Sequence, residues 1–379
     1  MKDYMKIYQE WLSNPYFDED TKAELRAIEG DENEIKERFY MDLEFGTAGL
    51  RGVIGAGINR MNIYVVRRAT QGLANYIIKQ GGADKGVAIA YDSRHMSPEF
   101  AMEAAMTLAA NGIKAYKFES LRPTPELSFA VRELGCIAGI NITASHNPPE
   151  YNGYKVYWED GAQFTPPHDK GVTEEVMAIT DLSTVRTTDA QSARTSGNYQ
   201  IIGREIDDKY IAQVKAQVVN QGAIDKMQDQ ITIVYTPLHG TGNIPARRVM
   251  KELGFTHVFQ VEFTADMIHK EMVRQMENAE EKPVISSFCP AIVRLIQVRF
   301  PALVDNILLV KAPVNASATY YHKILEGQGV PSEEIGIFYV TPCAAKIAAL
   351  KGAEGYSSTI KGVINMDTLY NKVYKQQRQ

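Results

Sequence analysis

Apolar side chains near the N-terminus recur at helical spacing, with charged residues between them. The positions concerned are Tyr4, Ile7, Tyr8, Trp11, Leu12, Leu25 and Ile28. A repeat of three to four residues is typical of amphipathic helices that bury one face. Residues 1–45 are therefore predicted to form a helical preface of two or three helices.

Beyond this preface, helical patterns alternate with short apolar runs. Helices are predicted over 62–79, 98–111 and 125–134, and strands over 87–91, 114–118 and 137–142. Alternating strands and helices are typical of a largely parallel sheet covered by helices. The first domain is therefore expected to be α/β, with a mixed or parallel sheet.

A polar stretch over 181–198 has little apolar periodicity and is interpreted as a connection between two lobes. A second α/β unit is predicted after it, with helices over 206–219 and 245–253 and strands over 231–235 and 257–261. A charged helix over 263–279 follows. Beyond it, residues 283–346 contain two isolated cysteines, each next to a proline.

Composition narrows the function classes. The 41 Lys and Arg against 46 Asp and Glu give a net charge of -5, which disfavours a nucleic-acid partner. No apolar run approaches the length of about 18 residues that a membrane span needs, and the start MKDYMKIYQEWL lacks the pattern of a signal peptide. The odd number of cysteines, three, argues against a disulfide framework. The protein is expected to be cytoplasmic.

The motif with the strongest chemical content is Thr143-Ala-Ser-His-Asn-Pro-Pro149, followed by Asn152-Gly-Tyr-Lys155. It comes directly after the strand predicted over 137–142, and ligands in α/β sheets bind at the carboxyl ends of strands. Ser145 could be an exposed nucleophile or phosphate carrier, with Lys155 able to stabilise or transfer charge. A turn rich in Ser, Asn and Pro is the alternative. No GxSxG elbow supports a hydrolase.

These residues resemble the phosphoserine loop of the α-D-phosphohexomutases. Within that family, the helical preface and the segment Phe45–Gly52 are most similar to the phosphoglucomutase and phosphopentomutase branch. Three other segments agree in order, namely Phe45–Gly52, Tyr91–His95 and Thr236–Gly242. The resemblance covers residues 1–262. It implies phosphoryl transfer between positions of a sugar phosphate of the glucose 1-phosphate and glucose 6-phosphate class, with a sugar 1,6-bisphosphate as activator.

The same resemblance implies roles for individual residues. Ser145 would carry the phosphate and, through it, hold Mg²⁺, and Lys155 would be the general acid and base. Arg51 and His146 would steady the phosphoryl group. The residues that would contact phosphate or substrate are Arg94, Asn147 and His239. The structural alternatives are a solvated charge for Arg51, a hydrogen-bonded histidine for His95 or His239, and an ion pair between Asp92 and Arg94.

Three family loops have no counterpart in this sequence. After Val261 there is no Asp-x-Asp-x-Asp-Arg segment for Mg²⁺, no sugar-selecting Gly-Glu-Glu loop and no Arg-Pro-Ser-Gly-Thr phosphate loop. Three carboxylates are the ligands that would complete a magnesium site around a phosphoserine. The Mg²⁺ site is therefore expected to be weak or incomplete, and catalysis impaired.

The C-terminal segment resembles a different family, the large-subunit domain of iron-only hydrogenases. The resemblance is carried by Ser286–Ala291, Lys311–Ala318 and Gly336–Lys346. It implies that Cys289 and Cys343 are ligands of an iron-sulfur cluster, which ordinarily takes four. Phe288 stands where the hydrogenases have a proton-transferring cysteine. The favoured interpretation of both cysteines, and of Cys136, is a small buried apolar side chain.

Four segments follow from these patterns: a helical preface over 1–45, phosphohexomutase domain I over 46–200, a partial domain II over 201–262 and a hydrogenase-like α/β fragment over 263–379. The switch of resemblance predicts a junction of two unrelated pieces near 261–265. The leading hypothesis for function is an impaired sugar-phosphate mutase. The alternatives are an iron-sulfur electron-transfer protein and a non-catalytic chimera.

Overall fold

A computed structural model describes residues 3–45, 49–227, 232–235, 240–254, 258–260, 262–279, 282–308, 310–341, 343–351 and 359–365. The chain forms two compact units, Met1–Tyr210 and Ile211–Gln379.

The N-terminal unit begins with three short helices, α1 (Tyr4–Ser13), α2 (Glu19–Arg26) and α3 (Glu32–Phe39). An aspartate caps each one, because the carboxylates of Asp3, Asp18 and Asp31 accept hydrogen bonds from first-turn backbone N–H groups. The helices share a core rich in aromatic rings, made of Tyr8, Trp11, Phe17, Phe39 and Tyr64 with smaller apolar residues. This layer is the helical preface that the sequence predicts.

A six-stranded sheet forms the centre of this unit, with the order β1-β5-β4-β2-β3-β6. The strands are β1 (Leu50–Val53), β2 (Val87–Tyr91), β3 (Ala115–Phe118), β4 (Ala138–Ile142), β5 (Tyr151–Trp158) and β6 (Tyr199–Ile202). Strand β5 runs antiparallel to β1 and β4, and the other neighbours pair in parallel. The sheet is mixed, as expected.

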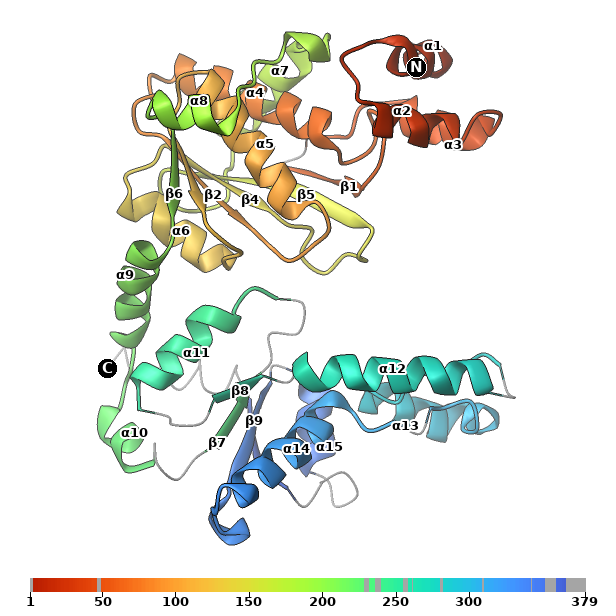
Figure 1. Cartoon of the computed structure of the whole chain (residues 1–379), viewed down its shortest axis with the longest axis vertical. Helices are drawn as coiled ribbons and strands as arrows, with labels where there is room; N and C mark the ends of the chain where they lie inside the picture. The colour runs from red at the N-terminus through yellow and green to blue at the C-terminus, as the bar shows by residue number, and fades with distance from the viewer. Residues whose placement is uncertain are drawn as a thin grey trace. The chain divides into compact units, whose positions relative to one another are not determined.

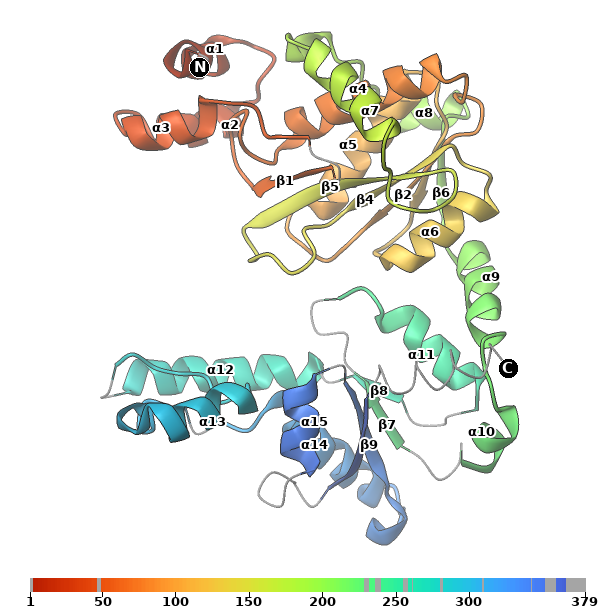
Figure 2. The same ribbon diagram turned by 180° about the vertical axis from the view of Figure 1, so that it is seen from behind.

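Helices cover both faces of the sheet (Figures 1 and 2). One face carries α4 (Ile63–Lys79), α5 (Ser97–Ala110), α7 (His168–Ala178) and α8 (Ala190–Thr195), and the other carries α6 (Thr124–Glu133). Alternate residues of the strands divide between the two cores: Ile89 and Ile140 pack on the α4 face, whereas Ala88 and Ala90 pack with Leu127 of α6. The unit is thus a three-layer α/β/α domain with the helical preface attached.

The predicted connection over 181–198 is wrong. This stretch contains the short 3₁₀ helix η1 (Leu182–Thr184) and α8, and it leads into β6, which pairs with β3 in the first sheet. Two buried apolar side chains, Val185 and Ala193, attach it to the domain. The sequence does not predict these elements, because each is short and buries only one or two apolar residues among polar ones.

The C-terminal unit contains a four-stranded parallel sheet with the order β10-β9-β7-β8. Its strands are β7 (Thr232–Tyr235), β8 (Val258–Gln260), β9 (Ile337–Thr341) and β10 (Ile360–Asn365). The first two lie in the predicted partial domain II and the last two in the hydrogenase-like segment. One sheet therefore joins strands from both sides of the predicted junction, and the junction itself stays a prediction.

Helices of the C-terminal unit pack around this sheet. They are α10 (Gln221–Met227), α11 (Asn243–Glu252), α12 (Glu262–Asn278), α13 (Pro290–Arg299), α14 (Pro313–Gly327) and α15 (Ala344–Lys351), with η2 (Pro301–Leu303) and η3 (Ser332–Glu334). The helix α9 (Arg204–Lys215) leads from the first unit into the second. The core is small and includes Leu325, Ile337, Tyr339 and Ile360. This unit is α/β, as expected.

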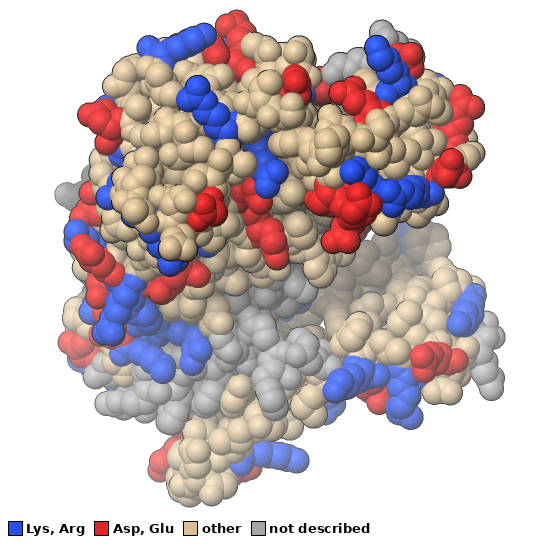
Figure 3. Space-filling model, turned by 45° about the horizontal axis from the view of Figure 1, so that its top comes forward, with Lys and Arg blue, Asp and Glu red and all other residues tan. Residues whose placement is uncertain are grey.

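Positive and negative side chains are interspersed over the face of the N-terminal unit drawn in Figure 3, with no continuous field of one sign. Among the described residues, no helix is long and apolar enough to cross a bilayer.

Candidate active site

The loop after β4 presents Ser145 to solvent. Ala144 is fully buried and anchors the loop, whereas Ser145 and His146 are exposed. Ser145 has a φ of 59°, a left-handed conformation that few residues other than glycine adopt. Its backbone N–H donates to Oγ1 of Thr143 at 3.1 Å, which fixes the turn from the strand. The sequence therefore places the serine hydroxyl at the carboxyl end of a fully buried strand.

Arg94 holds the backbone of this loop. Its Nη2 donates to the carbonyl oxygens of Ser145 at 3.0 Å and Asn147 at 2.6 Å. Its Nη1 donates to the carbonyl oxygens of Pro148 at 2.8 Å and Tyr151 at 3.0 Å. A guanidinium presents its donors in a rigid plane, so one side chain fixes four carbonyls. The geometry favours a positioning role for Arg94 over the phosphate contact that the sequence suggests.

A chain of polar contacts orients Arg94 in turn. Oδ2 of Asp92 lies 3.5 Å from Nε of Arg94. Oδ1 of Asp92 accepts hydrogen bonds from the backbone N–H of Arg94 at 2.9 Å and from Oγ of Ser97 at 2.7 Å. The fully buried Asn152 donates to Ser97 Oγ at 2.9 Å and to the carbonyl of His95 at 2.9 Å. The sequence suggests the ion pair of Asp92 with Arg94 but gives no indication of the roles of Ser97 and Asn152. The only sequence signal for Asn152 is its place in the motif before Lys155.

Arg51 and Lys155 lie on neighbouring strands beside the loop. In the register of β1 and β5, Arg51 is opposite Gly153, two residues before Lys155. Two glycines permit this close approach. A Cβ on Gly153 would lie 2.8 Å from the carbonyl oxygen of Leu50 in β1, and one on Gly49, where φ is 96°, would lie 1.9 Å from that of Tyr154 in β5. Real Cβ atoms do not approach so closely, and φ values of this kind favour glycine.

The two cations line a cavity of about 550 Å³, which we call the Arg51–Lys155 cavity. The other lining residues are Tyr40, Met41, Leu43, Glu44, Gly49, Leu50 and Asn59. Burial lowers the pKa of Lys155, the positive charge of Arg51 lowers it further, and Asp92 acts in the opposite direction. A lysine with a lowered pKa is suited to proton transfer.

The remaining predicted residues are placed as follows. Nη1 of Arg51 donates to Oδ1 of Asn147 at 3.0 Å, so the strand and the loop are joined directly. Nδ1 of His146 lies 3.5 Å from Oγ of Ser145, within reach of a proton on that hydroxyl. His239 lies outside the described residues. The loop thus brings Ser145, His146, Asn147 and Arg51 together.

A metal centre is not formed by the protein's own side chains within the described part of the chain. No group of three or more His, Cys, Asp or Glu residues there could hold an ion. The hydroxyl of Ser145 is a single oxygen ligand, and divalent Mg²⁺ requires several. The described donor set therefore does not fit the Mg²⁺ that the resemblance implies.

The cysteines differ from one another. Cys136 is buried, as predicted, and burial raises its pKa to about 12, so its thiol is not reactive. Cys289 is exposed and Cys343 is half-buried, so the interpretation of both as buried apolar side chains is wrong. Cys289 directly precedes α13 and Cys343 directly precedes α15. Two thiols without further ligands among the described residues do not fit a cluster that takes four.

Comparison with protein families agrees with both resemblances. Residues 42–183 match the family model for phosphoglucomutase/phosphomannomutase, alpha/beta/alpha domain I. Residues 241–369 match that for the iron only hydrogenase large subunit, C-terminal domain. The N-terminal unit therefore contains a region similar to domain I of the phosphohexomutases. The second match begins at residue 241, before the boundary at 263 that the motifs suggest.

Individual relatives make the first similarity more specific. The chain is 36% identical to a phosphoglucomutase of Staphylococcus haemolyticus over 244 residues, which are 64% of this chain and 43% of that protein. It is 36% identical to a human phosphopentomutase over 223 residues, 57% of this chain and 36% of that protein. This chain spans less than half the length of either relative. A solved Thermus thermophilus structure described as a phosphomannomutase aligns with a TM-score of 0.47 at 23% identity, covering 58% of this chain and 46% of that one.

Proposed function

We propose that Ser145 is a phosphate carrier in phosphoryl transfer to and from sugar phosphates of the glucose 1-phosphate and glucose 6-phosphate class. The observation that carries the proposal is the exposed, left-handed Ser145 on a loop fixed by Arg94 and flanked by Arg51. Similarity to phosphoglucomutases and phosphopentomutases supports the sugar-phosphate class. A cytoplasmic location stays a prediction.

The chemistry requires little covalent help, because phosphoryl transfer depends on positioning and on neutralising charge at the phosphoryl oxygens. In loading, Oγ of Ser145 forms a bond to phosphorus, the bond between phosphorus and the sugar oxygen breaks, and the serine proton passes to that oxygen. In unloading, a sugar hydroxyl forms a bond to phosphorus and loses its proton to the neutral amine of Lys155. The bond between phosphorus and Oγ of Ser145 breaks, and Oγ takes up a proton from water. Arg51 supplies positive charge beside the loop.

Phosphate incorporation at Ser145 tests the proposal. The purified 379-residue chain is incubated with glucose 1,6-bisphosphate and Mg²⁺, digested and examined by peptide mass spectrometry. We expect phosphate on Ser145 and none at that peptide in Ser145→Ala. Ser120→Ala, a serine outside the loop, is the matched control and should be labelled like the parent. A folded parent chain with unmodified Ser145 would refute the proposal.

Complete turnover is expected to be impaired even where loading occurs. The reason is that the described residues offer no carboxylate cluster for Mg²⁺ beside Ser145. Conversion of glucose 1-phosphate to glucose 6-phosphate, followed in a coupled assay, should therefore be slow relative to a single loading event. Rapid steady-state conversion by this chain would contradict the impairment but not the role of Ser145.

The match over 241–369 supports a second candidate, an iron-sulfur electron-transfer protein. Cys289 and Cys343 precede helices α13 and α15, which pack against each other. We rank this candidate below the first because two thiolates leave a cluster short of ligands. Anaerobic reconstitution with iron and sulfide should give no stable visible absorption, and a stable brown product that Cys289→Ser removes would reverse the ranking.

A further inference from the structure

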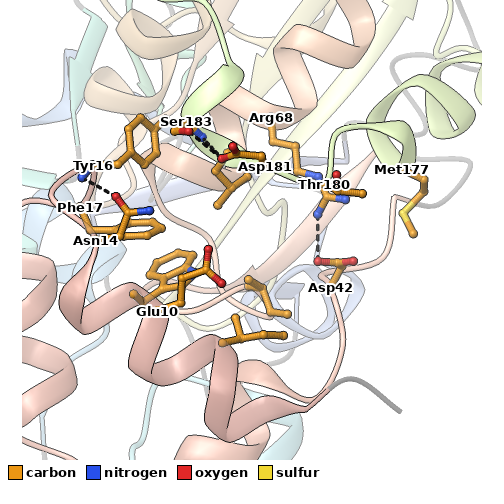
Figure 4. A pocket seen from close by; sticks show the side chains of 14 residues that line it. Glu10, Asn14, Tyr16, Phe17, Asp42, Arg68, Met177, Thr180, Asp181 and Ser183 are labelled. Carbon is orange, nitrogen blue, oxygen red and sulfur yellow. Dashed lines mark hydrogen bonds and ion pairs between the residues drawn. The ribbon is translucent and has the colours of Figure 1, made fainter.

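A second cavity of about 440 Å³ lies in the N-terminal unit between the helical preface and the segment that ends α7 (Figure 4). Small-molecule sites are commonly about 300–1,000 Å³. Its wall includes Trp11 and Phe17 from the preface and Met177 and Leu182 from the segment. None of its lining residues lines the Arg51–Lys155 cavity. This cavity is therefore separate from the proposed catalytic site.

One side of the cavity is aromatic. Trp11 and Phe17 are stacked with ring centroids 4.1 Å apart, and Tyr16 packs against Phe17 at 5.3 Å. Trp11 is only 2% exposed, and no hydrogen bond from its indole N–H is found among the described residues, although the nitrogen is not one of the fully buried atoms that lack a partner. The N–H is therefore left to solvent or to a ligand, because an indole N–H is a donor that normally finds an acceptor. The aromatic wall would thus be completed by a ligand with an apolar body and an acceptor atom.

Negative charge dominates the polar part of the wall. Arg68 is neutralised, since its Nη1 donates to Oδ1 of Asp42 at 2.9 Å and its Nε donates to the carbonyl of Val176 at 3.2 Å. Glu10 and Asp181, from α1 and the start of η1, are both exposed, and neither forms an ion pair with a described residue. Hydrogen bonds from Ser183 lower the pKa of Asp181 and keep it ionised. Figure 4 shows both carboxylates at the cavity.

We propose that this cavity binds a small aromatic primary amine that also carries a hydroxyl group. The ammonium would pair with Glu10 and Asp181, since charge-assisted hydrogen bonds to carboxylates are the stronger kind. The ring would pack on the Trp11 and Phe17 wall, and the hydroxyl oxygen would accept from the indole N–H. The wall has no unpaired cation among the described residues, so anions of the same shape are excluded.

Isothermal titration calorimetry of the full chain with three probes of one shape tests the site. Tyramine has the ammonium and the hydroxyl, phenethylamine lacks the hydroxyl, and tyrosol has a neutral hydroxyl in place of the ammonium. Tyramine should bind more tightly than both. The double variant Glu10→Gln with Asp181→Asn should bind tyramine with an affinity about tenfold lower, because two charge-assisted contacts are lost. Glu29→Gln, an exposed carboxylate outside the cavity, should leave its affinity unchanged.

The variant Trp11→Phe tests the proposed hydrogen bond from the indole N–H separately from the packing of the aromatic ring. This variant retains an aromatic side chain, and circular dichroism establishes that it folds. The preference for tyramine over phenethylamine should disappear in it. Equal binding of tyramine and tyrosol, no binding of tyramine to the parent chain, or unchanged affinity in the Glu10 and Asp181 double variant would each overturn the proposal. A preference retained in Trp11→Phe would overturn the part assigned to the indole N–H.

Discussion

At the residue scale, the protonation of Lys155 governs the proposed unloading of the phosphoserine. Burial and Arg51 lower the pKa of Lys155 from its ordinary value of 10.5, so the neutral amine is available at lower pH than in a free lysine. The rate of phosphate transfer from Ser145 should rise with pH and level off above the lowered pKa. In Arg51→Gln one positive charge is lost, the pKa of Lys155 rises, and the profile should shift to higher pH. Single-turnover rates across pH measure this shift, and Lys155→Met should abolish the rise. An identical midpoint in the parent and Arg51→Gln would contradict the coupling.

At the element scale, the loop after β4 depends on Arg94. Arg94→Ala removes the donors to four carbonyls and should slow loading of Ser145 more than it weakens binding of the sugar bisphosphate, because the loop that aims the serine is released. Arg94→Lys should recover only part of the rate, since an ammonium is a point charge without the planar fork. Loading rates against bisphosphate concentration separate the two effects. His95→Ala, next to it and exposed, is the control. A change confined to binding would argue for a direct phosphate contact instead.

The approach of β1 to β5 gives a second prediction at this scale. Gly49→Ala should destabilise the N-terminal unit because its Cβ would lie 1.9 Å from the carbonyl oxygen of Tyr154, in addition to the strain of a positive φ, which is worth about 1–3 kcal/mol. Gly30→Ala is the matched control, since Gly30 has a φ of 90° but nothing within 4 Å of a Cβ. Urea unfolding should show a larger loss for Gly49→Ala. Equal losses would mean that the strand moves aside without cost.

How far the sequence predicts these elements depends on the length of their patterns. The helix over 62–79 and the strand over 87–91 correspond to α4 and β2, because each has a long or wholly apolar run. Strands β1 and β6 have four residues each, too few for a period to show. Strand β5 contains the Asn152–Lys155 motif, whose polar residues indicate a functional site and hide the strand. The residues of the loop after β4 can be recognised from their motif. The four hydrogen bonds from Arg94 cannot, because they depend on the direction of backbone carbonyls, which a sequence does not show.

At the scale of the whole molecule, the N-terminal unit extends well past the family match that ends at residue 183. A chain of residues 1–210 should fold cooperatively by itself. A chain of residues 1–183 should not, because β3 loses β6 and the guanidinium of Arg122, 2% exposed, loses Asp207, to which it donates at 2.8 and 2.9 Å. Breaking a buried ion pair is destabilising, although Glu119 at 3.2 Å and Glu126 at 4.0 Å stay near the guanidinium. Thermal unfolding by circular dichroism compares the two, and cooperative unfolding of the shorter chain would contradict the boundary.

The segment over 40–44 forms a common wall of the two cavities. Asp42 lines the cavity beside Trp11, whereas Tyr40, Met41, Leu43 and Glu44 line the Arg51–Lys155 cavity, and the backbone N–H of Leu43 donates to the carbonyl of Ile58 at 2.8 Å. Inserting or deleting one residue here would bring a different side chain opposite Arg68 and leave that guanidinium without its carboxylate. The length of this segment is therefore constrained independently of its composition, and variation among natural relatives should take the form of substitutions rather than gaps.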